Sequence, residues 1–248
     1  MDYNKYSSIW QSKKSSSTHY AHIYLEKPAI KKILENRQFE NILDLGCGSG
    51  EDITWLKNLG EVTGFDSSSE LIELAKFEHP DNTFIVHDLN NEIVLDQQYD
   101  LIYSSLTFHY IQDWDKLFKN LNKLLKPKGS IIFSTHHPIK WGSQTTKTKE
   151  SNQFLMGYKK IKNENKTYEI YGDYLNQYKI EEKLFQQLDI THYNRPLSEM
   201  FRVFKTAGFQ VREFIEPKPI EVAKTKLPDF YEVHSKIPLF VIWEIKKV

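Results

Sequence analysis

The stretch NILDLGCGSGED, residues 41–52, carries the strongest structural signal in the chain. It begins with a short apolar run that is typical of a buried strand, and it continues into a turn that contains Gly46, Gly48 and Gly50. A strand, a glycine-rich turn and a helix in this order bring backbone N–H groups close to a ligand at the edge of an α/β sheet. The stretch therefore predicts an α/β fold with a ligand site at this turn.

The turn departs from the fingerprint that binds dinucleotides. That fingerprint, G-x-G-x-x-G, requires a third glycine at the position of Glu51, and Asp52 adds a second carboxylate beside it. Two carboxylates disfavour a diphosphate at a helix N-terminus. A nicotinamide-dependent dehydrogenase is therefore a distant alternative, which binding of NADH would test.

Strand and helix signals alternate along most of the chain, which predicts a mainly parallel sheet covered on both faces by helices. One example is the helix expected to begin at the serines of residues 67–69 and to bury Leu71, Leu74 and Ala75. Strands are expected at residues 61–66, 83–88, 99–108, 130–138, 210–217 and 238–248, and helices at residues 51–60, 67–80, 113–129 and 196–209.

The alternation stops between residues 139 and 194, where the sequence is rich in Tyr, Lys and Asn and predicts a hairpin around residues 163–165. We interpret this segment as a lid insertion on the substrate side. Residues 1–38 are expected to form N-terminal cap helices. The length of 248 residues fits a single domain with such an insertion.

Composition limits the classes of partner. Lys plus Arg and Asp plus Glu each total 33, so the formal net charge is zero and no nucleic-acid partner is expected. There is one cysteine and no apolar run long enough to span a membrane. We therefore expect a cytoplasmic protein that is a monomer or homodimer, with no membrane partner.

Acidic residues end three successive predicted strands. Asp44 precedes the glycine turn, Asp66 lies 22 positions later, and Asp88 ends the third strand. A carboxylate at the second of these places suits the hydroxyls of a ribose, and the third could meet an adenine amino group. Together the three suit a ligand with ammonium, ribose and adenine groups.

With these motifs in place, the chain resembles the class I S-adenosylmethionine-dependent methyltransferases. The resemblance extends to a narrower set of small-molecule enzymes of the methyltransferase type 11, or ubiquinone/menaquinone-methyltransferase-like, kind. The general motifs are LDLGCGSG (43–50), VTGFDSS (62–68), FIVHDLN (84–90), YDLIYSSLTFHYI (99–111) and LLKPKGSIIFSTHHP (124–138). The narrower motifs are HYAHIYLEKPAI (19–30), STHHP (134–138), YNRPLSEMFRVFKTAGF (193–209) and EPKP (216–219).

The resemblance implies a Rossmann-like, doubly wound, seven-stranded sheet whose last strand is antiparallel. It also implies S-adenosylmethionine as the cofactor. The glycine turn would approach the methionine part of the cofactor, Asp66 would bind the ribose, and Asp88 would hold the adenine. The cofactor-binding residues that it implies are Tyr20, Asp44, Gly46, Cys47, Gly48, Asp66, Ser67, Asp88, Leu89, Ser104 and Ser105.

The candidate catalytic residues are His109, His136 and His137, which follow the fourth and fifth strands. Histidine titrates near neutrality, so any of them could act as a general base, although each could equally be a structural histidine. Adjacent side chains on an extended chain point to opposite faces, so we expect no metal site at His136 and His137.

Candidate substrate-binding residues lie in the insertion and at its end. Arg195 has the geometry to pair with a substrate carboxylate, with a bracing role as the alternative. Tyr171 and Tyr174 could line an acceptor pocket, although aromatic residues also serve to pack a hairpin. The expected reaction is transfer of a methyl group to an N, O or C atom of a small molecule. The alternatives are a protein or RNA methyltransferase and a non-catalytic cofactor-binding module.

Overall fold

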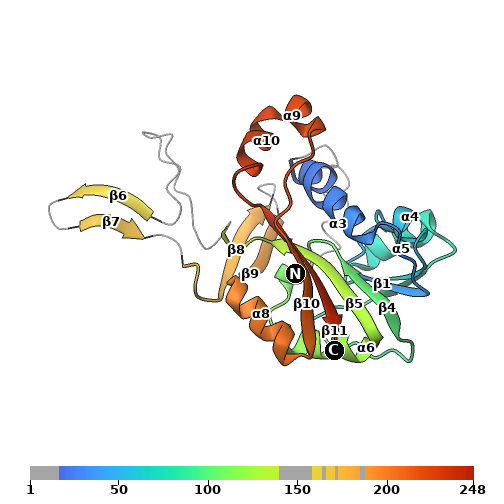
Figure 1. The fold of residues 1–248 in the computed structure, drawn as a ribbon. Helices are drawn as coiled ribbons and strands as arrows, with labels where there is room; N and C mark the ends of the chain where they lie inside the picture. Colours follow the sequence, from blue (N-terminus) through green and yellow to red (C-terminus); the bar gives the residue numbers. More distant parts are fainter. Residues whose placement is uncertain (1–16, 140–157, 164–165, 171–172, 185–187) are drawn as a thin grey trace.

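The computed structural model describes residues 17–139, 158–163, 166–170, 173–184 and 188–248. Its centre is a seven-stranded sheet in the order β10-β11-β5-β4-β1-β2-β3 (Figure 1). All neighbours in this sheet are parallel except β11, which is antiparallel to both β5 and β10. The strands are β1 (Asn41–Leu45), β2 (Glu61–Asp66), β3 (Thr83–Val86), β4 (Tyr99–Ser104), β5 (Leu125–His136), β10 (Phe209–Ile215) and β11 (Phe240–Lys247). The predicted fold class, including the antiparallel last strand, is confirmed.

The chain reverses its direction of winding between β1 and β4. From β1 it runs outward to β2 and β3, and it then returns to β4 on the other side of β1. Open α/β sheets bind ligands at such a switch point, beyond the carboxyl ends of the strands. The sheet order therefore places the crevice at the glycine turn that follows β1.

The two faces of the sheet bury separate hydrophobic clusters. Alternate residues of β1 supply them, because Leu43 packs with the helices α6 and α8, whereas Ile42 packs with α3, α4 and α5. The helices of the sheet are α3 (Lys27–Leu34), α4 (Ile53–Leu56), α5 (Ser69–Glu78), α6 (Trp114–Leu124) and α8 (Leu197–Thr206). This is the layered arrangement that the alternating sequence pattern predicts.

Several boundaries differ from the predicted ones. The helix α5 has the expected serine cap, Ser68, but it buries Ile72 and Ala75, and Leu71 and Leu74 are only partly buried. The helix after the glycine turn spans only the four residues of α4. Two short helices, α9 (Val222–Lys226) and α10 (Pro228–His234), were not predicted, because they have only five and seven residues and α10 buries none of them.

The described N-terminal residues form a continuous helical segment. It consists of α2 (Ser17–Ala21), the π-helix η2 (His22–Glu26) and α3. Single π-helical turns are uncommon and often lie at functional sites. Its buried side chains Ala21 and Leu25 pack with Phe240 of β11, so the segment is anchored to the sheet.

The described residues of the insertion form two hairpins between β5 and α8. The predicted hairpin is present, because β6 (Tyr158–Asn163) pairs with β7 (Lys166–Ile170); Figure 1 shows it extending away from the sheet. The second hairpin, β8 (Tyr178–Leu184) and β9 (Leu188–Asn194), contacts the short helix η3 (Phe108–Tyr110) after β4. The strand β9 therefore lies against the segment that follows β4.

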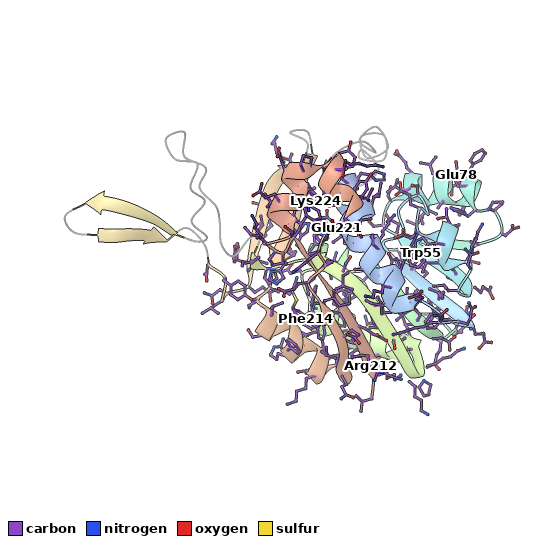
Figure 2. The ribbon with its side chains drawn as sticks, turned by 45° about the horizontal axis from the view of Figure 1, so that its top comes forward. Trp55, Glu78, Arg212, Phe214, Glu221 and Lys224 are labelled. Carbon is purple, nitrogen blue, oxygen red and sulfur yellow. The ribbon has the colours of Figure 1, made fainter. Side chains whose placement is uncertain are left out.

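The edge strand β10 carries both charged and aromatic side chains. Arg212 and Phe214 are labelled in Figure 2, and the Phe214 ring lies 4.6 Å from that of buried Trp243. A bulge between Val211 and Glu213 interrupts the pairing of β10 with β11. A bulge and charged residues both disfavour further pairing at an edge.

Over the described part of the chain, no helix combines the length and apolar character that a membrane span requires.

Candidate active site

The glycine turn after β1 is held by backbone hydrogen bonds to β2. The N–H groups of Gly46 and Cys47 both donate to the carbonyl of Phe65, at 2.7 and 2.9 Å. Gly46 and Gly48 have φ angles of 78° and 56°. A Cβ atom on Gly46 would lie 2.1 Å from Thr107 Oγ1, whereas one on Gly48 would meet no atom within 4 Å. Gly46 thus permits close packing, and Gly48 leaves open space above the turn.

Asp66 connects the end of β2 to this turn. Its Oδ2 accepts a hydrogen bond from Gly48 N at 2.9 Å, and its Oδ1 accepts one from Ser68 N at 2.9 Å. Burial raises the pKa of Asp66, and the bonds from Ser68 and Gly48 offset only part of that effect. Ser67, next to it, is exposed. The carboxylate is therefore fixed in orientation beside the open space at Gly48.

Asp44 lies beneath the turn as a buried carboxylate. It is 1% exposed, and its Oδ2 has no hydrogen-bond partner among the described residues. Burial, together with the charges of Asp52 and Asp66, raises its pKa well above the ordinary value. A buried carboxylate oxygen without a partner is costly, so this place suits a ligand that brings a donor or a positive charge.

The strand ends on either side differ in accessibility. Asp88 is exposed, and its Oδ1 accepts from the backbone N and the Nδ2 of Asn90, both at 2.9 Å. Leu89 beside it is buried. Ser104 is fully buried and donates to the carbonyl of Leu45 at 2.7 Å, so its hydroxyl joins β4 to β1. Cys47 is a buried turn residue that packs into the core.

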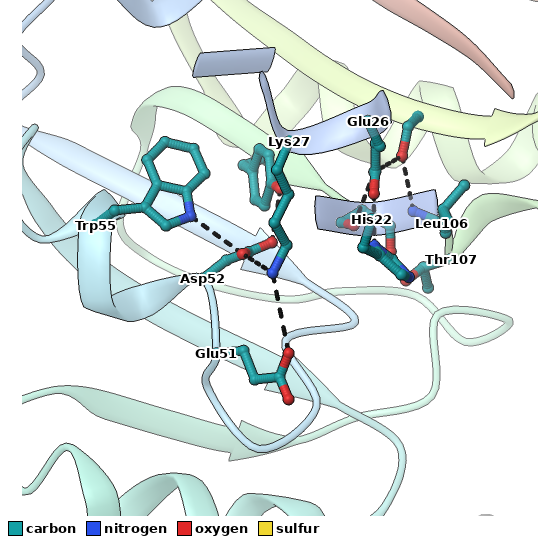
Figure 3. A network of polar contacts seen from close by, with 11 residues as sticks. His22, Glu26, Lys27, Glu51, Asp52, Trp55, Leu106 and Thr107 are labelled. Atoms are coloured by element: carbon teal, nitrogen blue, oxygen red, sulfur yellow. Dashed lines mark hydrogen bonds and ion pairs between the residues drawn. The ribbon is translucent and has the colours of Figure 1, made fainter. Parts of the chain in front are cut away.

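A buried carboxylate of the N-terminal segment joins the ends of β4 and β5 (Figure 3). Glu26 is fully buried, and its Oε1 accepts from Ser105 Oγ at 2.8 Å and from Ser134 Oγ. Ser134 in turn accepts from the backbone N of Leu106 at 2.9 Å. Nδ1 of His22 lies 2.6 Å from the other carboxylate oxygen, Oε2. The N-terminal segment is thus bonded directly to the carboxyl edge of the sheet.

A second contact ties this segment to the helix after the glycine turn. Lys27 Nζ lies 2.8 Å from Asp52 Oδ1, which also accepts from Trp55 Nε1 at 3.0 Å, and Tyr103 donates to Asp52 Oδ2 at 2.7 Å. Burial raises the pKa of Asp52, but Lys27 and these hydrogen bonds outweigh it and leave that pKa lowered. The negative potential expected from Glu51 and Asp52 is therefore partly offset by Lys27, 3.9 Å from Glu51.

The structure brings two of the three candidate histidines together. The rings of His109 and His136 are stacked with centroids 4.1 Å apart, and His192 of β9 meets them edge-on at 6.0 and 5.7 Å. His137 points elsewhere, because its Nε2 lies 3.0 Å from Glu216 Oε1. Burial lowers the pKa of His137, and Glu216 offsets only part of that effect. The neighbouring histidines diverge as predicted for an extended chain.

Arg195 is a buried residue beside the helix α6. Its Nη2 donates to the carbonyls of Ile111 and Gln112, both at 2.5 Å, and its guanidinium lies 4.7 Å from the centroid of the Trp114 ring. Burial lowers its pKa to about 9. It lines a cleft of about 550 Å³ together with Glu199. These contacts are those of an arginine that braces the segment before α6. A contact between Arg195 and a substrate stays a prediction.

The tyrosines predicted at the site have different positions. Tyr20 is partly buried in α2, with its ring 6.4 Å from that of Tyr24. Tyr174 is partly buried in the segment before β8, and Tyr171 lies outside the described residues. Within the described ranges, no group of three His, Cys, Asp or Glu residues has the arrangement of a metal site.

Sequence reasoning missed four residues of this region: His22, Glu26, Lys27 and His192. His22 and Glu26 are four positions apart in HIYLE, and this helical spacing was a usable signal for a contact between them. Lys27 and His192 contact partners from distant parts of the chain, and a local sequence pattern does not predict such contacts.

The comparisons with known proteins agree with this geometry. A family model described as a methyltransferase domain matches residues 18–213. A protein of Haemophilus influenzae, described as uncharacterized, is 30% identical over 207 residues, which cover 78% of this chain and 76% of that protein. Two solved S-adenosylmethionine-dependent methyltransferases, from Mesorhizobium loti and (as a putative one) Listeria monocytogenes, have TM-scores of 0.74 and 0.73. Each is 24% identical to this chain, and each match covers 90% of it. The matches cover 97% and 96% of the two solved chains, respectively, so the three proteins share the fold.

Relatives with named substrates match a smaller part. A demethylmenaquinone methyltransferase of Thermotoga maritima is 33% identical over 43% of this chain and 47% of its own length. A trans-aconitate 2-methyltransferase of Escherichia coli is 33% identical over 49% of this chain and 50% of its own length. The chain thus spans about half the length of these two relatives.

The residues at the carboxyl edge fit S-adenosylmethionine chemically. The cofactor carries an ammonium group, a sulfonium cation and ribose hydroxyls, and the site offers the unpartnered buried oxygen of Asp44, the open space at Gly48 and the carboxylate of Asp66. The fold and the family match lead to the same assignment. The chain belongs to the class I S-adenosylmethionine-dependent methyltransferases, and S-adenosylmethionine is its cofactor.

Proposed function

We propose that this enzyme transfers the methyl group of S-adenosylmethionine to a small-molecule acceptor in the cytoplasm. The observation that carries the proposal is the cover over the carboxyl edge of the sheet. The N-terminal segment is bonded there through the fully buried Glu26, and Lys27 bonds it to the start of α4. Such a cover favours an acceptor small enough to be enclosed. Relatives named for demethylmenaquinone and trans-aconitate support the same substrate class.

The proposed cofactor contacts follow the strand ends. We assign the ammonium group to Asp44, the ribose hydroxyls to Asp66 and the adenine to Asp88. The remaining proposed contacts line the same edge: Tyr20, Gly46, Cys47, Gly48, Ser67, Leu89, Ser104 and Ser105. The hydroxyls of both serines already donate within the protein, that of Ser104 to the Leu45 carbonyl and that of Ser105 to Glu26.

The acceptor side is proposed to lie at the stacked histidines. His109 and His136 follow β4 and β5, and His192 of the insertion packs against both rings. We propose that these rings contact the acceptor and that the insertion acts as a lid, with Tyr171, Tyr174 and Arg195 toward the substrate. The geometry supports His137 less than the other two catalytic candidates, because Glu216 engages its ring.

The reaction asks the protein mainly for alignment. S-adenosylmethionine supplies an activated methyl group, which the acceptor displaces in line from sulfur. The chain binds and orients the two reactants and keeps water out, and such positioning can contribute about 7 to 11 kcal/mol. Glycine at position 48 allows the backbone to approach the cofactor, so this position provides a direct test of the binding site.

Gly48→Ala is expected to lower the affinity for S-adenosylmethionine about tenfold or more, since the new methyl group would fill the open space above the turn. An alanine held at the φ angle of 56° would also reduce the free energy of unfolding by about 1 to 2 kcal/mol. Gly208→Ala is the matched control, because Gly208 has a φ angle of 82° away from the site. It should lose similar stability and keep its affinity in calorimetric titration. Equal affinity in both variants would contradict the assignment of Gly48.

The proposed function is tested by calorimetric titration followed by a transfer screen. S-adenosylmethionine and S-adenosylhomocysteine are titrated into the purified protein, which is then incubated with methyl-labelled cofactor and fractionated small-metabolite, RNA and protein pools. We expect both cofactor forms to bind and the label to enter a small metabolite. Label in RNA or protein would replace the proposal with the alternative acceptor class, and binding without transfer to any pool would contradict it.

A further inference from the structure

A carboxylate and an imidazole meet beside the ends of β4 and β5. Glu26 is fully buried, and its Oε2 lies 2.6 Å from His22 Nδ1. The other carboxylate oxygen is held by the hydroxyls of Ser105 and Ser134, so the carboxylate cannot turn away from the ring. The His22 side chain keeps 17% exposure.

This arrangement equips an imidazole to accept a proton. A carboxylate at Nδ1 holds the proton on that nitrogen, orients the ring and stabilises the imidazolium that forms when Nε2 takes a second proton. A similar division of roles recurs in catalytic triads on unrelated folds. His22 and Glu26 are neighbours on one turn of η2, so the pair is preformed by the local helix.

The pair also lies next to the loop that leads to the cofactor turn. Ser105, which bonds to Glu26, is followed by Leu106, whose backbone N donates to Ser134 (Figure 3). The next residue, Thr107, is the one that packs against Gly46 of the glycine turn. His22 is therefore connected to the glycine turn through Glu26 and Ser105, the backbone from Ser105 to Thr107, and the packing of Thr107 on Gly46.

We infer that His22, oriented by Glu26, removes a proton from the methyl acceptor, and that the acceptor is therefore an N–H or O–H group. The inference rests on the proposed function. A lone pair of the acceptor nitrogen or oxygen forms the bond to the methyl carbon, and the carbon–sulfur bond breaks with its electron pair going to sulfur. The acceptor proton passes to His22 Nε2 and then to solvent. His109 and His136 keep the role of contacting the acceptor.

Charged groups around the ring agree with this role. Burial lowers the pKa of His22, but the charge and hydrogen bond of Glu26 outweigh burial and leave the pKa raised. Of the other nearby charges, Lys27 acts to lower the pKa of His22, and Asp52, at the start of α4, acts to raise it. The rate should therefore fall as the pH drops through this raised pKa, because the protonated ring cannot accept a proton.

The test compares His22→Gln, Glu26→Gln and the control His234→Gln on α10, using the acceptor found in the transfer screen. At saturating cofactor, His22→Gln should lose about 10² to 10⁴-fold in rate with the dissociation constant of S-adenosylhomocysteine within about twofold. Glu26→Gln should move the acidic limb of the pH–rate profile to lower pH, which a purely structural role would not do. His234→Gln should match the wild type.

Three results would overturn the inference while leaving the proposed function intact. The first is a His22→Gln rate close to that of the wild type, and the second is an acidic limb of the pH–rate profile that does not move in Glu26→Gln. The third is a wild-type product that is a sulfonium or quaternary ammonium ion, because the acceptor of such a product has no proton to lose. Identifying the methylated product needs only the wild-type protein, so this measurement tests the inference even if a variant fails to fold. Absence of transfer by the wild type would remove the proposed function and the inference together.

Discussion

Asp66→Ala is expected to weaken S-adenosylmethionine binding by about 1.5 to 3 kcal/mol, the size of a hydrogen bond to a charged group. In the structure, the Asp66 carboxylate is held by Gly48 N and Ser68 N beside the open space of the glycine turn. In the proposed function, its remaining lone pairs accept from ribose hydroxyls. Calorimetric titration of the cofactor into both proteins measures the difference directly.

Two further variants separate ribose binding from turn structure. Asp66→Asn keeps an oxygen for only one of the two backbone N–H groups and removes the charge, so it should disturb the turn less than Asp66→Ala and still lose affinity. Asp96→Asn changes an exposed carboxylate away from the strand ends and should bind as the wild type does. A dissociation constant unchanged in Asp66→Ala would reject the ribose assignment.

The fold was predictable because its signals are local and repeated. The apolar run of 41–45 and the glycines after it predict a strand and its turn, and the same pattern recurs along the chain. The start of α5 was predictable because serines favour the N-cap position, and Ser68 caps this helix. The short helices α9 and α10 were not predictable, since five and seven residues are too few to show a periodic pattern.

Within the candidate site, the sequence predicted only the positions of the residues at the strand ends, and their contacts with the cofactor stay predictions. Asp44, Asp66 and Asp88 follow from the rule that parallel strands end at one edge of the sheet. Glu26 and Lys27 depend on where the N-terminal segment docks, and their partners Ser134 and Asp52 lie 108 and 25 residues away in the sequence. Such contacts depend on tertiary packing, which local periodicity does not encode.

Lys27→Met is expected to lower the free energy of unfolding by about 3 kcal/mol, because it leaves Asp52 as a buried carboxylate without its cation. The Asp52 side chain is 9% exposed and that of Lys27 is 19% exposed, which places the loss at the lower end for a buried pair. Chemical denaturation at neutral pH measures it. Lys76→Met is the matched control, because Lys76 pairs with Glu73 on the surface and should cost no more than about 0.5 kcal/mol.

The stability that the Lys27–Asp52 ion pair contributes should depend on pH. The pKa of Asp52 is lowered in the folded protein, so its ion pair contributes stability above the unfolded pKa and loses it as the pH falls through the folded pKa. The difference between wild type and Lys27→Met should therefore shrink in acid. Adding Asp52→Asn to Lys27→Met should recover most of the loss, since the neutral amide needs no cation. If Lys27→Met costs no more than Lys76→Met, solvent screens the pair, and the Glu26 contacts alone hold the N-terminal segment on the site.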